Sequence, residues 1–395
     1  MASIDMDNYK KAVRPNEEDF INFSCNISQL KTFRINQYNG FFFENNKNNE
    51  ISITKDIIIC TIQTAIEKHH SIIESKNLLN SIEQNQEGLF IYIPDNISLE
   101  IPLQILDVIK ANEPISIESK SIIIVGQNSH IKLIYCDDTV NGNISSTESN
   151  INIFLENNSS LEYYKMENIN NSSSIITNTN FVLANNAQLK TFWLSINGGN
   201  IKNNLNVSFE GEYSKADLNG LYLVDKEQVV DNVVSVSHNK PNCSSIQNYK
   251  GILDDSARAQ FQGHIRVMKY ASFTEAMQNN RNILLTDKAI VNTQPFLEIY
   301  NDDVKCSHGA TVGQLDESAM FYMRSRGISE RSARMLLMFA FCTEILSKAS
   351  IEELVDKLQD IIKRRLHGEL SSCENCVLLC NTPCGTFDID MSKIN

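Results

Sequence analysis

The chain is 395 residues long, enough for several domains or for one elongated domain with appendages. Its 48 acidic and 35 basic residues give a net charge of −13, which argues against nucleic-acid binding. The N-terminus has no signal-peptide pattern and no apolar run reaches the ~20 residues that span a bilayer, so we expect a cytoplasmic protein without a membrane partner.

Two further features of the composition limit the chemistry. A reducing compartment disfavours disulfides, so we expect the ten cysteines as free thiols or metal thiolates. The sequence contains neither GxxxxGK[ST] nor GxGxxG, the glycine-rich loops that bind phosphates. We therefore expect no nucleotide on this chain, and any ATP hydrolysis in its process to be performed by a partner.

Residues 1–87 form the first predicted region, which we expect to be mostly helical. Within it, residues 55–82 place apolar side chains three and four positions apart, the spacing of one or two amphipathic helices. The remainder has no such periodicity, so the region as a whole has a mixed character.

Residues 88–315 form the second region, and their pattern is that of short strands. Runs such as GLFIYIP, HIKLIYC and QLKTFWL are separated by Asn, Ser, Gly and Asp. No helical stretch intervenes before about residue 285, which argues against alternating βαβ units. We therefore expect a mainly β core.

A weak repeat underlies these strands. A polar corner and a small residue precede an alternating strand in segments that begin at Asn128, Asn158, Asn186, Ser214, Ser256 and Thr286. The offsets of 30, 28, 28, 42 and 30 residues are typical of stacked coils in a β-solenoid. A β-sandwich would instead need hairpin dipeptides such as Asn-Gly between neighbouring runs, and these are few. The pattern favours the solenoid.

Cys306 and His308 stand two positions apart in DDVKCSHGATVG, where an extended strand would place both side chains on one face. A thiolate and an imidazole suit iron, and two ligands on one face would form half of a metal site. A nucleophilic cysteine activated by histidine would also need an oxyanion site and an orienting group, for which the sequence offers no indication. From spacing alone, a buried cysteine beside a turn-capping histidine is the simplest interpretation.

Residues 316–370 form a C-terminal helical region. Asp316 and Ser329 are expected N-caps of two helices, and Gly327 stands where the first helix should end. Ser350 opens a capping box for a third, amphipathic helix. Such helices can cover the open end of a solenoid. The run MLLMFAFC is more apolar than a cap requires, which indicates a small helical core or a partner surface.

Residues 371–395 form a cysteine-containing tail. The run Cys-x2-Cys-x3-Cys-x3-Cys consists of Cys373, Cys376, Cys380 and Cys384. Four cysteines this close suggest zinc or an iron–sulfur cluster, although the spacing differs from that of a zinc ribbon. A tail whose cysteines hold no metal is an equal alternative.

The longest distinctive stretches resemble one known family. NKPNCSSIQNYKGILDDSARAQFQGHIRV (239–267), TEAMQNNRNILLTDKA (274–289) and PFLEIYNDDVKCSHGATVGQLDESAMFYMRSRGI (295–328) are similar to the SufB/SufD family of iron–sulfur cluster assembly scaffolds. The resemblance is close over about residues 235–346. Residues 297–313 resemble the SufD branch, because the Glu-His-Glu type sequence of the SufB branch is absent at Cys306–His308.

This resemblance implies a fold, a function and partners. The fold is a right-handed parallel β-helix with a mixed or helical N-terminal region and a C-terminal helical domain. The function is that of a non-catalytic scaffold in a SufBCD-type complex. A SufB-like protein would bind the β-helix, and a SufC-like ABC ATPase would dock on the C-terminal helices. A transient iron–sulfur cluster shared with the partner would use His308 as the main ligand of this chain and Cys306 as the weaker one.

A second class of function is a stand-alone β-helix enzyme that acts on carbohydrate. It would need clustered carboxylates or calcium ligands along one face of the solenoid. The sequence has only scattered Asp and Glu residues, so this alternative ranks behind the scaffold.

Overall fold

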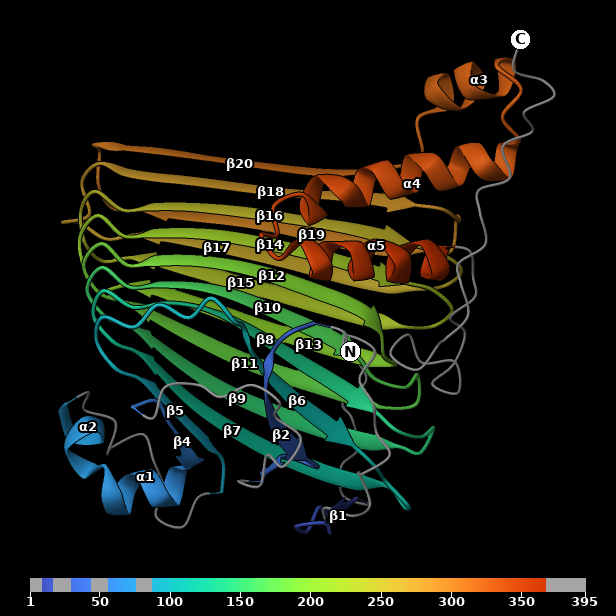
Figure 1. Cartoon of the computed structure of the whole chain (residues 1–395). Coiled ribbons are helices and arrows are strands. Elements are labelled where there is room, and N and C mark those ends of the chain that lie inside the picture. The colour runs from blue at the N-terminus through green and yellow to red at the C-terminus, as the bar shows by residue number, and fades with distance from the viewer. Residues whose placement is uncertain (1–8, 17–29, 44–55, 76–86, 367–395) are drawn as a thin grey trace.

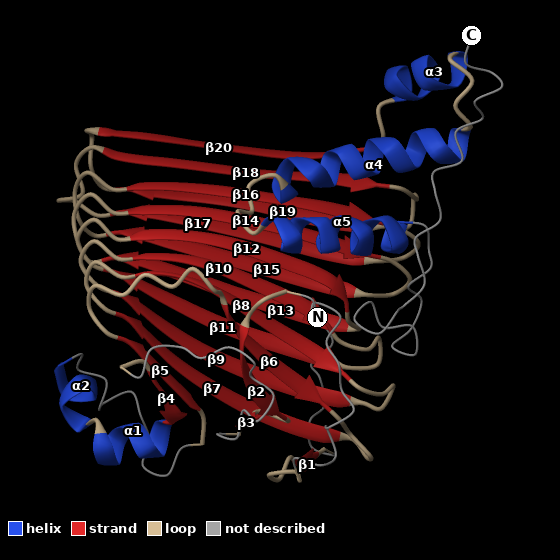
Figure 2. Cartoon of the chain, in the orientation of Figure 1, coloured by secondary structure: helices blue, strands red, loops and turns tan. Residues whose placement is uncertain are grey.

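The computed structural model describes residues 9–16, 30–43, 56–75 and 87–366, which form a parallel β-solenoid with a few helices. Successive strands of the solenoid alternate between two facing sheets, here called sheet A and sheet B (Figure 1). Figure 2 shows that strands dominate the stack and that helices lie outside it. The mainly β fold predicted from the repeat is confirmed.

Each coil contributes one strand to each sheet. The strands of sheet A are β1 (Lys10–Lys11), β4 (Ile58–Thr61), β5 (Leu89–Ile93), β7 (Ile115–Val125), β9 (Ser145–Leu155), β11 (Ser174–Leu183), β13 (Asn200–Phe209), β15 (Val229–His238), β17 (Arg258–Val267) and β19 (Ile290–Ile299). The strands of sheet B are β2 (Phe33–Tyr38), β3 (Phe41–Phe42), β6 (Leu103–Ile109), β8 (His130–Thr139), β10 (Ser160–Asn168), β12 (Gln188–Asn197), β14 (Lys215–Val224), β16 (Ser244–Leu253), β18 (Thr274–Leu284) and β20 (Val304–Gly313).

The corners of the coils explain the repeated asparagines. Asn128, Asn158 and Asn186 adopt φ values of 55°, 57° and 56°, a left-handed conformation that asparagine tolerates better than most residues. The side chains also connect neighbouring coils, since Asn158 Nδ2 donates to Asn128 Oδ1 at 3.0 Å. Strands β11, β13 and β15 of sheet A alternate between core and solvent, which buries one face of each strand.

The predicted repeat combines two ladders. The corners at Asn128, Asn158, Asn186 and Ser214 precede strands of sheet B, whereas those at Ser256 and Thr286 precede β17 and β19 of sheet A. The offset of 42 residues therefore crosses from one sheet to the other instead of measuring a single coil. Both sheets use the same corner chemistry, so the sequence pattern does not separate them.

The described part of the first 87 residues is mixed. The helices predicted within residues 55–82 are present as α1 (Ile62–Lys68) and α2 (His70–Ser75). Residues 58–61 form strand β4 instead, because they pair antiparallel with β5 and extend sheet A. The boundaries proposed at residues 87, 315 and 370 stay predictions.

Three helices follow the solenoid: α3 (Glu317–Ser325), α4 (Glu330–Leu346) and α5 (Glu352–Leu366). The predicted caps are confirmed, since Asp316 accepts from the N–H groups of Ser318 and Ala319, and Ser329 accepts from that of Ser332. Gly327 takes the positive φ of 87° that ends α3.

The helices do not close the open end of the solenoid as expected. Helices α4 and α5 pack against the outer face of sheet B, where Cys136, Met166 and Leu194 stand at one register position (Figure 1). This outer row is apolar and must be covered, which explains the apolar run in α4. Arg365 fixes the end of α5, because its guanidinium donates to Asp225 Oδ1 at 2.7 Å and to the Ile196 carbonyl at 3.0 Å.

Candidate functional site

Strand β20 is the last strand of sheet B and carries Cys306 and His308. Among the described residues it pairs with β18 alone, in parallel, with Cys306 opposite Ala276 and His308 opposite Gln278. Side chains two positions apart on a strand share a face, so both residues point to the same side of sheet B. Because Ala276 and Gln278 are buried in the last coils, that side is the interior. The two residues therefore line the open mouth of the solenoid.

Cys306 and His308 differ in exposure. Cys306 is half-buried and packs with Leu297 and Val304 against the small apolar cluster that contains Val267 and Ala276. His308 is exposed, since no further coil covers it in the described residues. The imidazole is thus the group that a ligand or partner can reach first.

The surroundings of Cys306 make it a weaker ligand. Burial raises the pKa of the Cys306 thiol above its ordinary value, and a hydrogen bond with the backbone of Ala276 offsets only part of that rise. A thiol must lose its proton to bind a metal, so this environment disfavours the thiolate at neutral pH. Among the described residues, no three His, Cys, Asp or Glu side chains form a potential metal site.

Sequence reasoning missed two glutamines below His308. Gln278 on β18 and Gln247 on β16 occupy the same register position one and two coils deeper. They are 3% and 0% exposed. The sequence does contain a signal for this row, because Gln247, Gln278 and His308 follow one another at the spacing of the repeat.

The open end also exposes two strand edges and apolar side chains. Strands β19 and β20 are the outermost strands of their sheets in the described residues. Ile290, Phe296, Ile299 and Val312 of these strands are 41–47% exposed. Uncovered strand edges flanked by apolar groups are typical of an interface.

A stack of carboxyl groups lies deep inside the solenoid. Asp107, Asp137 and Glu167 occupy one register position on β6, β8 and β10. Lys165 Nζ lies 2.6 Å from Asp137 Oδ2 and 3.8 Å from the ring centre of Tyr135. Burial raises the pKa of Asp107 to about 7 and that of Glu167 to about 7.

Helix α3 presents aromatic side chains to solvent. Phe321 and Tyr322 are 76% and 60% exposed, whereas Met320 is buried. Figure 1 places α3 beyond α4, away from the coils of the solenoid. This surface, defined by Phe321 and Tyr322 and called the α3 face below, is separate from the mouth that contains His308.

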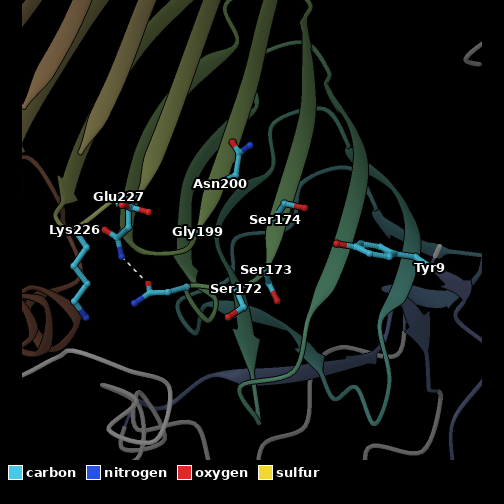
Figure 3. Close-up of a pocket in the computed structure, with 10 residues that line it drawn as sticks. Tyr9, Ser172, Ser173, Ser174, Gly199, Asn200, Lys226 and Glu227 are labelled. Carbon is cyan, nitrogen blue, oxygen red and sulfur yellow. Dashed lines mark hydrogen bonds between the residues drawn. The ribbon is translucent and has the colours of Figure 1, made fainter. Parts of the chain in front are cut away.

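A polar hollow of about 530 Å³ lies at the corners of earlier coils (Figure 3). It is lined in part by Ser172, Ser173, Asn200 and Lys226. The hollow is several coils away from β20, so it does not belong to the mouth.

The four tail cysteines, Cys373, Cys376, Cys380 and Cys384, lie outside the described residues. None of the helices within the described ranges has the length and apolarity needed to cross a bilayer.

Comparison with known families gives two matches. Residues 108–341 match the family model described as SUF system FeS cluster assembly, SufBD core domain. Residues 4–105 match the model of the SufBD protein N-terminal region.

Three curated proteins are similar to this chain. The iron–sulfur cluster assembly protein SufD of Escherichia coli K12 is 36% identical over 53% of this chain and 50% of its own length. A SufBD family protein of Synechocystis is 28% identical over 83% of this chain and 76% of its own length. A SufBD family protein of Mycobacterium leprae is 32% identical over 47% and 49%. The chain therefore spans about half the length of the first and third of these relatives.

Proposed function

Because this chain belongs to the SufBD family of iron–sulfur cluster assembly proteins, we propose that it is a SufD-type scaffold subunit. It pairs with a SufB-like β-helix protein and docks a SufC-like ATPase, and it performs no catalysis itself. The observation that carries this proposal is the open mouth of the solenoid, where an exposed imidazole, a cysteine and two free strand edges lie together.

The partner surface is the open end. Exposed apolar side chains on β19 and β20 would be buried by a second β-helix, and the free edges can extend its sheets. The N–H groups of Ile290 and Tyr300 donate to the carbonyls of Ala257 and Val267, at the two ends of β17. The backbone groups of the alternate residues of β19, Pro295 among them, therefore point to the outer edge. Proline offers no donor there, which leaves β20 as the less interrupted edge.

The shared site forms where the two chains meet. His308 supplies the main ligand of this chain to the nascent iron–sulfur species, which is the cargo of the complex. Cys306 supplies a second ligand at most, since its burial disfavours the thiolate. Two ligands hold half of a site, so the SufB-like partner supplies the others.

The α3 face is the docking surface for the ATPase. Phe321 and Tyr322 are exposed to solvent, and the Arg326 guanidinium lies 5.3 Å from the centre of the Tyr322 ring. Aromatic residues on a rigid helix are common anchors of protein interfaces. Figure 1 shows α3 to one side of the coils and past the level of β20.

The carbohydrate-active alternative is not favoured. The carboxyl groups that do line up, Asp107, Asp137 and Glu167, are at most 2% exposed and lie inside the solenoid. A polysaccharide cannot reach them.

Co-purification tests the proposal. The tagged chain is co-expressed with the SufB-like and SufC-like proteins of the same organism and purified without oxygen. We expect all three proteins to elute together and the complex to carry iron and sulfide. A chain that purifies without either partner under these conditions would refute the assignment as a scaffold subunit.

A further inference from the structure

One register position joins the last three coils of sheet B. Gln247, Gln278 and His308 are successive Cα partners on β16, β18 and β20. Neighbouring strands lie about 4.8 Å apart, so each side chain stands directly above the one before it. Gln278 is therefore the residue immediately beneath the exposed imidazole.

The carboxamide of Gln278 reaches across the interior. Its Nε2 atom lies 1.7 Å from the position that a Cβ atom of Gly263 would occupy. Gly263 belongs to β17 in the facing sheet, so the amide fills the space left by the missing side chain. The residue above Gly263 is Pro295, which has no polar side-chain atom. The Gln278 amide thus forms the floor of the mouth.

This amide is buried without a hydrogen-bond partner. Neither Nε2 nor Oε1 of Gln278 has a partner among the described residues. The next two inward-facing amides on β18 do have hydrogen-bond partners. Asn280 Nδ2 donates to the Tyr249 carbonyl at 3.2 Å, and Asn282 Nδ2 donates to Asn280 Oδ1 at 2.6 Å. An unsatisfied buried amide is costly, and this one lies directly under His308, where a partner can still bind.

We propose that Gln278 is a positioning residue for His308. Once one ring nitrogen of His308 binds iron, the other carries a proton, and Gln278 Oε1 accepts the hydrogen bond from that N–H group. The bond fixes the tautomer and the direction of the ring, as an outer partner commonly does for a metal-bound histidine. The assignment rests on the proposed function, since it presupposes that His308 binds iron.

Gln247 offers a matched control. It has the same side chain, is equally buried and also lacks a partner for both polar atoms among the described residues. It lies one coil deeper and has no contact in register with His308. Gln278→Met and Gln247→Met both replace an unpartnered amide with an apolar side chain of similar size, so both variants should fold.

The test uses the complex of this chain with its SufB-like and SufC-like partners and Co²⁺ as the probe. We expect Gln278→Met to weaken Co²⁺ binding roughly tenfold and to alter the visible spectrum of the bound ion. Gln247→Met should match the wild type in both. Gln278→Glu, which keeps an acceptor oxygen at the same place, should restore most of the affinity.

His308→Ala distinguishes a failure of the proposed function from a failure of the role of Gln278. If it leaves Co²⁺ binding unchanged, the proposed function of the mouth fails. If it abolishes binding while Gln278→Met behaves like the wild type, only the role of Gln278 is wrong. Equal losses in Gln278→Met and Gln247→Met would also overturn that role, because they would reflect general packing.

Discussion

At the scale of single residues, the buried carboxyl groups make the stability of the fold depend on pH. Asp107 and Glu167 face the hydroxyl-bearing row of Ser119, Ser149 and Thr177 on sheet A and lie near the Asp137–Lys165 ion pair. One lysine cannot balance three buried carboxylates, and burial raises the pKa of Asp107 and that of Glu167 to about 7.

This arrangement predicts a dependence of stability on pH. The pKa values of Asp107 and Glu167, each about 7, exceed those of the unfolded chain, so the folded state binds more protons above pH ~4. The stabilising contribution is complete below pH ~4 and is lost as the pH rises through about 7. We expect Asp107→Asn and Glu167→Gln to gain stability relative to the wild type over this range, by on the order of a few kcal/mol each.

Denaturant unfolding at a series of pH values measures this difference. Ile105→Val, which trims the core without changing a titrating group, should cost about 1 kcal/mol at every pH. If the free energies of unfolding of the wild type and of Asp107→Asn differ by the same amount at every pH between 4 and 8, the buried carboxyl group is already ionised over this range.

The four tail cysteines predict the metal content of the isolated chain. If Cys373, Cys376, Cys380 and Cys384 bind a metal, the isolated chain should carry about one zinc or iron per molecule. Changing all four to serine should remove that metal and leave the far-ultraviolet circular dichroism unchanged, because the solenoid is stabilised by its own stacked strands. Elemental analysis that gives the same metal content for both proteins would leave the tail without a metal-binding role.

At the scale of secondary structure, the sequence predicted the strands and their corners better than the sheet to which each strand belongs. Asn128, Asn158 and Asn186 marked coil corners because their chemistry is local. The assignment of Ser256 and Thr286 to the same ladder failed because both sheets share that chemistry. Gln278 was missed for a different reason: its spacing from His308 follows the repeat, but only the fold shows that its amide approaches Gly263 of the facing sheet.

The α3 face carries a prediction about the ATPase. Removing everything after Gly313 would uncover the apolar outer face of sheet B, so it cannot isolate the role of α3. Phe321→Ala combined with Tyr322→Ala changes only exposed side chains. We expect this variant to bind the SufC-like ATPase at least tenfold more weakly in calorimetry, since aromatic anchors often contribute more than 1 kcal/mol each.

Tyr213→Ala is the control for α3, because Tyr213 is also an exposed aromatic residue, at 56%, but lies on a corner of the solenoid. It should bind the ATPase like the wild type. Unchanged binding by the α3 double variant would move the docking surface elsewhere.

At the scale of the whole molecule, the solenoid is asymmetric. Its outer sheet B face is covered by α4 and α5, whereas its last coil leaves the edges of β19 and β20 free in the described residues (Figure 1). A free edge invites pairing with another chain. The end where His308 lies is therefore the end at which we propose that a second chain binds.

The open end predicts how the heterodimer can be broken. Phe296→Asp combined with Val312→Asp would bury two charges in the interface, so we expect the complex with the SufB-like protein to dissociate in size-exclusion chromatography. Tyr213→Asp introduces a charge at a similarly exposed aromatic position far from this end and should leave the complex intact. An undisturbed heterodimer in the double variant would place the interface on another surface.

We propose that this chain contributes His308 to a site completed by a second chain. The most direct measurement is iron and sulfide content of the co-purified complex for wild type, His308→Ala and Cys306→Ser, with the recovery of each subunit determined in parallel. We predict that His308→Ala retains all subunits and loses most of the cluster, and that Cys306→Ser loses less. A His308→Ala complex that assembles and carries the normal amount of cluster would show that His308 is not a ligand.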